Sequence, residues 1–366
     1  MRWLQTLLRF DWVLLLATLA LVAIGLIVMY GIGISRPEVD LFLFQKQLVG
    51  GLIGLTIMLG LGSFDYRHLR GLALPIYAFG LGLLLAVLPF GETVRGTRGW
   101  FVIGRLSFQP VEVAKLCLIV FLAAFLVRYA HRRLPWEAIV GSALATLGYV
   151  VLVLFQPDLG SAMVMLAIWG VFILFVGLPW RSLAVIVVLM TVVAGLGWNL
   201  LLKPYQQARF LAFLNPTVDE LGAGYNVTQA QIAVGSGGLL GKGIGEGSQA
   251  RLRFLPEAAT DFTFAVVGEE LGFVGAVLVL GLVGIIVVRL AALASVAQDD
   301  FASLIVVGLT TLLMVHVVVN AGMSLGVMPV TGIPFPFLSA ASSFILAMSI
   351  GLGLAESIAV RRKTFA

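Results

Sequence analysis

The chain has 366 residues, of which 60% are hydrophobic and only 11% charged, and its formal net charge is +5. About a quarter of the residues of a soluble domain are charged, so this composition excludes a soluble globular protein. No basic run with interleaved aromatic residues occurs, so the positive charge does not indicate nucleic-acid binding. The single cysteine, Cys117, excludes an internal disulfide.

Apolar segments long enough to cross a membrane recur along the whole chain, since a spanning helix needs about 20 mostly apolar residues. We predict ten spans, at roughly 12–33, 45–64, 70–90, 110–128, 137–155, 159–178, 181–202, 262–289, 301–327 and 337–360. The first is too long for the core of a cleavable signal and is expected to stay as an anchor. The sequence therefore predicts an all-α membrane protein, one polytopic domain over 1–366.

The distribution of basic residues predicts the orientation, because Lys and Arg favour cytoplasmic loops. With the N-terminus inside, twelve fall on the inner side: Arg2, Arg9, Arg67, Arg70, Arg128, Arg132, Arg133, Arg181, Arg289, Arg361, Arg362 and Lys363. Five fall on the outer side: Arg36, Lys46, Arg95, Arg98 and Arg105. Both termini are thus expected in the cytoplasm, and the large loop 203–261, between helices seven and eight, on the extracytoplasmic face.

This large loop and the start of the next helix, Gly222 to Gly272, are the most polar and glycine-rich part of the chain. Within the loop, Tyr205–Leu214 is expected to form a short amphipathic helix and Asn226–Ala233 a further helical turn. Thr260 is expected to cap the eighth spanning helix. The glycine run does not match a phosphate-binding P-loop, because glycine follows Lys242 where that motif has Ser or Thr; we expect it to be flexible.

A second polar loop, 91–109, precedes a helix that begins at Pro110. No β-strand is expected there or elsewhere. Glu112 and Lys115, three residues apart, share one face of that helix. They form either an internal ion pair or a charged cleft for an anionic head group, and the sequence leaves both open.

Three further sites carry carboxylates at membrane depth, where ionisable residues are costly and tend to be functional. Asp158, at a sharp turn, is either a helix N-cap or a ligand of a divalent cation. Asp261, at the end of the large loop, is either a capping residue or a general base. Glu269 and Glu270 lie two turns further in, with cation binding and contacts between helices both open. His316 is expected to be a satisfied histidine between helices.

Four segments of the chain, in order, closely resemble the SEDS (shape, elongation, division and sporulation) family and its RodA branch in particular. They are Ser107–Lys115, Gln156–Gly160, Gly222–Gly272, and Asn320–Met323 continuing to Pro329–Ser339. The chain departs from the family pattern at Ala340–Ala341, where an aromatic residue and glycines are common. It also departs at Gly99, where an arginine often precedes the tryptophan.

The resemblance implies a peptidoglycan glycosyltransferase of the bacterial cytoplasmic membrane that polymerises lipid II with a class B penicillin-binding protein. The family's essential loop aspartate corresponds to Asp261, and its Gln-Pro-Asp-Leu-Gly aspartate to Asp158. The expected substrate-binding residues are Glu112, Lys115, Arg98, Arg105, Gln109, Lys242 and Arg209.

The chemistry expected is a single inverting displacement. Asp261 would act as general base, while a divalent cation (Mg or Mn), with Asp158 and Asp261 as its candidate ligands, would assist the pyrophosphate leaving group. A lipid-linked oligosaccharide flippase is the alternative. A flippase would need polar residues deep in the inner half of the membrane. The sequence predicts few polar residues there. A non-catalytic scaffold would leave the charged outer cavity unexplained.

Overall fold

The computed structural model describes residues 9–35, 38–94, 96–104, 106–131, 133–200, 204–214, 222–252 and 254–362. The long helices are α2 (Trp12–Ile34), α3 (Phe42–Ser63), α5 (Ala73–Phe90), α6 (Pro110–Leu126), α7 (Trp136–Phe155), α8 (Leu159–Val176), α9 (Trp180–Leu200), α13 (Thr263–Val296), α14 (Asp300–Ser324) and α15 (Ser342–Val360). The short ones are α4 (His68–Gly71), the 3-10 turn η1 (Val127–Tyr129), α10 (Pro204–Leu214), α11 (Ala223–Ser236) and α12 (Ser248–Arg251).

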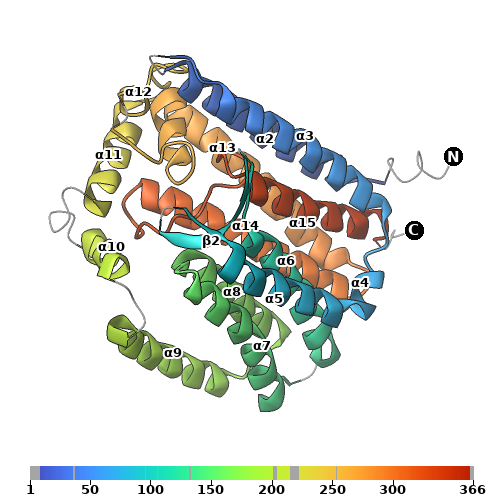
Figure 1. The fold of residues 1–366 in the computed structure, drawn as a ribbon. Helices are drawn as coiled ribbons and strands as arrows, with labels where there is room; N and C mark the ends of the chain where they lie inside the picture. The colour runs from blue at the N-terminus through green and yellow to red at the C-terminus, as the bar shows by residue number, and fades with distance from the viewer. Residues whose placement is uncertain are drawn as a thin grey trace.

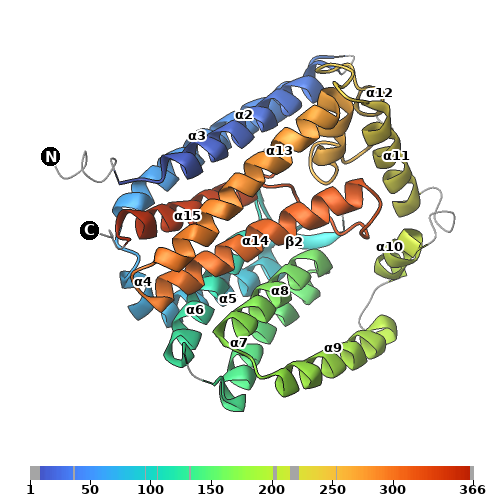
Figure 2. The same ribbon diagram turned by 180° about the vertical axis from the view of Figure 1, so that it is seen from behind.

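Each long helix falls on a predicted span. Within the described residues, nine are long and apolar enough to cross a membrane, and the helix at the seventh predicted span, α9, contributes the shorter apolar stretch Trp180–Leu189. The chain is thus a multi-pass helical membrane protein, as expected. Helices α6, α14 and α15 are mostly buried and form the centre of the bundle, whereas α9 runs away from α8 at an angle (Figures 1 and 2).

The bundle has two distinct ends. Both termini lie at one end, and α10, α11 and α12 lie at the other (Figure 1). We call these the termini end and the loop end. In its described residues the large loop contains α10, α11 and α12, and α10 and α11 confirm the two predicted helical segments.

The polar loop 91–109 contains a small antiparallel sheet, in the order β1 (Glu92–Val94), β2 (Thr97–Ile103), β3 (Leu106–Phe108). Glu92 pairs with Trp100 and Phe101 with Phe108. The expectation that the chain has no strands is therefore wrong. The run Trp100–Ile103 is rich in aromatic and β-branched residues, which favour strands.

Helix α13 is interrupted at Gly272, whose φ is 67°. A side-chain carbon at this glycine would lie 2.3 Å from the backbone nitrogen of Gly241, so the glycine run packs directly against the break. The backbone N–H groups of Lys242 and Gly243 donate to the carbonyls of Glu269 and Glu270 at 3.0 and 3.1 Å. The glycine run is therefore held on α13 by backbone hydrogen bonds, and its flexibility stays a prediction.

Candidate active site at the loop end

The first component of the site is a buried ion pair on α6. Lys115 Nζ lies 2.9 and 3.0 Å from the two carboxylate oxygens of Glu112, and both side chains are almost completely buried. Of the two roles left open, the structure shows the internal ion pair. Lys115 also lies 3.3 Å from Nε2 of His316, whose other ring nitrogen is 3.1 Å from the carbonyl of Pro334. His316 is thus the satisfied histidine between helices that the sequence predicts.

Asp158 joins α8 to α6. Its Oδ1 accepts the backbone N–H of Ser161 at 2.9 Å, so it is the N-cap of α8, one of the two roles left open, and the role as a cation ligand stays a prediction. Its Oδ2 accepts from Nε2 of Gln109, the residue before α6, at 3.4 Å. The backbone N–H of Gln109 donates to Oγ of Ser343 at 2.9 Å. Asp158 is therefore fixed by groups from two helix ends.

A cavity opens at Asp158. Its lining includes Asp158, Gln206 and Arg209 of α10, Thr97 of β2, and Thr331. The surface helix α10 thus brings the cation Arg209 to the cavity that Asp158 lines, which the sequence could not show because the two residues are 51 positions apart along the chain.

Asp261 stands two residues before α13 begins, and its backbone is held on both sides. Asn320 of α14 donates from Nδ2 to the carbonyls of Asp261 and Ile333, both at 2.8 Å. Ser339 Oγ donates to the carbonyl of Thr260 at 2.6 Å. Thr260 does not cap α13, contrary to expectation: the N-cap position is Phe262, and the Thr260 hydroxyl donates to Glu257 instead.

One segment lies between Asp158 and Asp261. A side-chain carbon at Gly160 would lie 2.8 Å from the carbonyl oxygen of Thr331, so the start of α8 packs tightly against that residue. A side-chain carbon at Gly332 would lie 3.6 Å from Oδ2 of Asp261. Because consecutive Cα atoms are only about 3.8 Å apart, the segment Pro329–Ile333 borders both carboxylates. The two predicted acidic residues thus belong to one region.

The remaining predicted residues lie elsewhere at the loop end. Arg98 is exposed and donates to the carbonyls of Pro89 and Gly91, at 3.1 and 3.2 Å, where α5 ends. Lys242 lies 2.8 Å from the buried carboxylate of Glu269, to which Ser248 also donates. Arg105 is outside the described residues.

Glu269 and Glu270 anchor the glycine run. Besides Lys242 and Ser248, the backbone N–H of Gln249 donates to Glu269, and that of Gly245 donates to Glu270, both at 3.1 Å. These contacts pack the large loop on α13, which is neither of the two predicted roles, and cation binding stays a prediction.

The donor set of the region suits a hard cation only in part. Among the described residues, no three His, Cys, Asp or Glu side chains gather as a metal-ligand cluster. Magnesium, however, is commonly bound by one or two carboxylates together with water and substrate phosphates. Asp158 and Asp261 match that smaller donor set.

Asn320, Ser339 and Gln206 are the residues of the region to which the sequence assigned no role. Asn320 is a completely buried amide within an apolar helix, where an unpaired polar group would be costly. That isolation is a signal for a buried partner, although it does not say which carbonyls the amide holds. Ser339 and Gln206 gave no comparable signal.

The fold and this site agree with the similarity to known proteins. The profile of the FtsW/RodA/SpoVE family, described as cell cycle protein, matches residues 11–364. Peptidoglycan glycosyltransferase MrdB of Escherichia coli K12 is 37% identical, with 96% of this chain and 94% of that protein covered. Peptidoglycan glycosyltransferase RodA of Treponema pallidum is 33% identical, with 96% and 98% covered.

Two solved structures share the fold over almost the whole chain. One, a peptidoglycan synthase complex that coordinates polymerization and crosslinking, has a chain with a TM-score of 0.81 and 38% identity, covering 96% of this chain and 97% of that one. The rod shape determining protein RodA of Thermus thermophilus gives a TM-score of 0.71 at 35% identity, covering 97% and 98%. A multi-pass helical protein with this match belongs to the class of membrane proteins that the family profile describes. The chain is a member of the FtsW/RodA/SpoVE family.

Proposed function

We propose that this chain is a peptidoglycan glycosyltransferase that polymerises lipid II into glycan strands at the outer face of the cytoplasmic membrane. Its family membership and the names of its relatives support the activity. The observation that carries the proposal is the placement of Asp261. Its backbone is clamped by Asn320, and its neighbour Thr260 is clamped by Ser339, beside a segment that also borders Asp158.

Asp261 is the general base in this proposal. Lipid II carries its own leaving group, a lipid pyrophosphate, so the protein must supply a base for the acceptor hydroxyl and positive charge for the departing diphosphate. A positioned carboxylate contributes roughly 10²–10⁴-fold to such a step. Holding the backbone on both sides fixes where the carboxylate can reach, and preorganisation of this kind favours reaction.

The charge on the leaving group is met by cations at the same end. Arg209 lines the cavity next to Asp158. The acceptor oxygen attacks the anomeric carbon in line, the bond from that carbon to the pyrophosphate breaks, and Asp261 takes the hydroxyl proton. One displacement inverts the anomeric centre, so an α-linked donor gives a β-linked strand.

A divalent cation (Mg or Mn) would be held by Asp158 and Asp261 with substrate phosphate oxygens, and it would supply positive charge to the diphosphate. Arg98 and Lys242 belong to the same proposal as substrate-binding groups further out on the loop end, and Arg105, which is outside the described residues, is proposed for the same role. Glu112 and Lys115, two of the predicted substrate-binding residues, are buried on α6, and neither lines the cavity at Asp158.

The similarity to a chain of a peptidoglycan synthase complex supports a partner. We propose that this partner is a class B penicillin-binding protein, which crosslinks the strands that this chain polymerises.

The test is polymerisation of purified lipid II by the full chain, alone and with a class B penicillin-binding protein, with Mg²⁺ or with a chelator. Three proteins are compared: wild type, Asp261→Asn, and Glu246→Gln as the matched control, since Glu246 is an exposed carboxylate at the same end. We expect Asp261→Asn to lose roughly 10²-fold or more of the rate, and the control to retain it.

Full activity of a folded Asp261→Asn variant would show that Asp261 is not the general base. If wild type gives no strands even with the partner, translocation of lipid II across vesicles is measured next. Translocation without polymerisation would establish the flippase instead. Equal polymerisation rates with and without chelator would show that the reaction does not need a divalent cation.

A further inference from the structure

A second cavity lies at the termini end, separate from the candidate active site. It is lined by Arg9, Arg67, Arg361, Arg362, Asp65 and Gln298, with Val360. These residues come from four parts of the chain: the segment before α2, the turn after α3, the link between α13 and α14, and the end of α15. Four guanidinium groups and one carboxylate thus face the same hollow.

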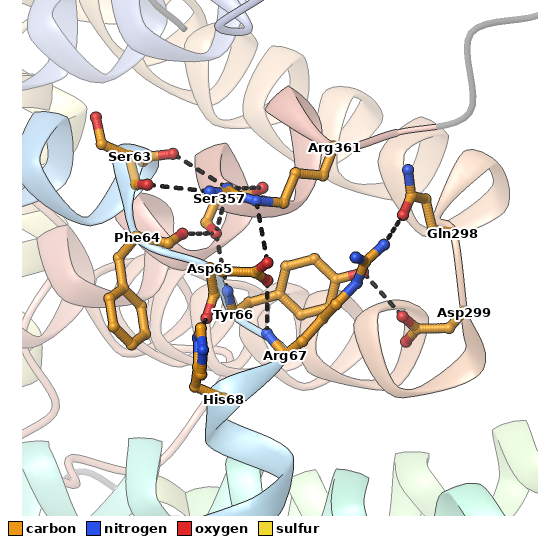
Figure 3. A network of polar contacts seen from close by, with 11 residues as sticks. Ser63, Phe64, Asp65, Tyr66, Arg67, His68, Gln298, Asp299, Ser357 and Arg361 are labelled. Atoms are coloured by element: carbon orange, nitrogen blue, oxygen red, sulfur yellow. Dashed lines mark hydrogen bonds and ion pairs between the residues drawn. The ribbon is translucent and has the colours of Figure 1, made fainter. Parts of the chain in front are cut away.

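Several hydrogen bonds hold the side chain of Arg361 in place at this cavity (Figure 3). Its Nη1 donates to the carbonyl and hydroxyl oxygens of Ser357 at 2.9 and 3.1 Å, and its Nη2 donates to the carbonyl of Ser63 at 3.0 Å. Its Nε lies 3.7 Å from Oδ2 of Asp65. The negative charge of Asp65, the one carboxylate of the lining, is therefore already balanced by Arg361, which these hydrogen bonds hold in place.

Two of the other three arginines, Arg9 and Arg362, carry surplus positive charge. Arg67 donates to the side-chain oxygen of Gln298 and is attracted electrostatically by Asp65 and Asp299. In the part of the chain that the structure describes, no ion pair neutralises Arg9 or Arg362, and both are exposed. The nearby Glu356 is buried and accepts the backbone N–H of Asp11 at 2.9 Å. A hollow with uncompensated guanidinium groups attracts anions, and the planar fork of arginine matches phosphate oxygens.

The level of the cavity along the spanning helices indicates the source of a phosphate that would bind there. Helix α3 ends at Ser63 and α15 at Val360, and both helices are apolar spans, so the arginines stand where the hydrocarbon region ends. Phospholipid headgroups occupy that level. Basic pockets between spanning helices bind anionic headgroups, and each basic residue near the surface adds about 1 kcal/mol of attraction.

We propose that this cavity binds the phosphate of an anionic phospholipid headgroup from the leaflet at the termini end. The bound headgroup would bridge four segments that are far apart in the sequence. It would therefore hold the N-terminal segment and the end of α15 against the turn after α3. The site is independent of the proposed transferase activity.

The full chain is purified in detergent, and its binding of phosphatidylglycerol and of phosphatidylcholine is compared by native mass spectrometry. The test variant is Arg9→Gln/Arg362→Gln. The matched control is Arg70→Gln/Arg181→Gln, which removes the same charge from exposed positions outside the cavity. We expect wild type and control to prefer phosphatidylglycerol, and the test variant to bind it roughly tenfold more weakly.

Two results of this comparison would overturn the proposal: no preference for the anionic lipid in wild type, or an equal loss in both double variants. The second would mean diffuse surface charge. A thermal-melt arm with lipid-free protein distinguishes the sources of phosphate. Stabilisation by millimolar inorganic phosphate, lost in the test variant and not exceeded by phosphatidylglycerol, would assign the cavity to a soluble anion and overturn the lipid.

Discussion

At the scale of single residues, the interior of the bundle balances its charges locally. Glu112 and Lys115 neutralise each other within one helix turn. At the termini end, Arg289 Nη2 lies 2.7 Å from the carboxylate of Asp11. A charge buried without such a partner would cost several kcal/mol. The termini end, which the sequence predicts to face the cytoplasm, thus holds ionisable groups that the prediction for the inner half did not include. These groups are bound to each other, however, and do not by themselves form a path for a flippase.

Removing one member of the Glu112–Lys115 pair should destabilise the protein more than removing both. Glu112→Gln or Lys115→Met alone leaves a buried charge and should cost about 3–5 kcal/mol. The double variant should recover most of that loss, because neither charge remains. Thermal melts of the four proteins in one detergent measure the coupling, and additive losses would mean that the two groups do not stabilise each other.

Asn320 should act on catalysis through Asp261, because its amide holds the carbonyls of Asp261 and Ile333. Asn320→Leu should lower kcat by roughly 10-fold, corresponding to about 1.4 kcal/mol of positioning, with little change in KM. In the Asp261→Asn background the same substitution should have almost no further effect. An equal further loss in that background would show that Asn320 acts independently of the aspartate.

The separate residues of the site were predictable to different degrees. Ionisable side chains in apolar segments pointed to Glu112, Lys115, Asp158 and Asp261, because such positions are costly without a purpose. The clamp around Asp261 could not be predicted. Its hydrogen bonds join residues up to 79 positions apart, and they end on backbone carbonyls, which no sequence pattern marks.

At the scale of elements, length and hydropathy were sufficient for the spanning helices but not for their ends or interruptions. The predicted eighth span, 262–289, is a 34-residue helix that continues to Val296. Its break at Gly272 depends on the glycine run packed against it, which is a tertiary contact. The sheet in 92–108 was missed because three short strands in a polar loop give a weaker signal than a 20-residue apolar run.

Gly272 should be the least replaceable glycine of α13. Its φ of 67° and the close approach of Gly241 leave no room for a side chain. Gly272→Ala should therefore lower the melting temperature, with a cost above the roughly 1 kcal/mol typical of a backbone effect alone. Gly281→Ala is the control, because a side chain there meets open space, and it should be neutral or slightly stabilising. Equal melting temperatures for both variants would contradict the packing role of the break.

At the scale of the whole molecule, the two ends of the bundle have different chemistry. The loop end holds the carboxylates, Arg209 and the clamped Asp261. The termini end holds the arginine cavity and the buried Asp11–Arg289 pair. The proposed polymerisation requires the loop end to face the outside, where lipid-linked sugars meet. The excess of arginine at the termini end favours the same orientation.

This orientation can be measured with single cysteines. Cys117 is the chain's only cysteine and is buried, so Cys117→Ala gives a background without a reactive thiol. In that background, Leu240→Cys places a thiol at the loop end, where Leu240 is 80% exposed, and Arg70→Cys places one at the termini end. A membrane-impermeant maleimide applied to intact spheroplasts should label only Leu240→Cys. Arg70→Cys should react only after the membrane is opened. Labelling of Arg70→Cys in intact spheroplasts would mean that the termini end faces the outside. The proposed active site would then lie on the wrong side for polymerising exported lipid II.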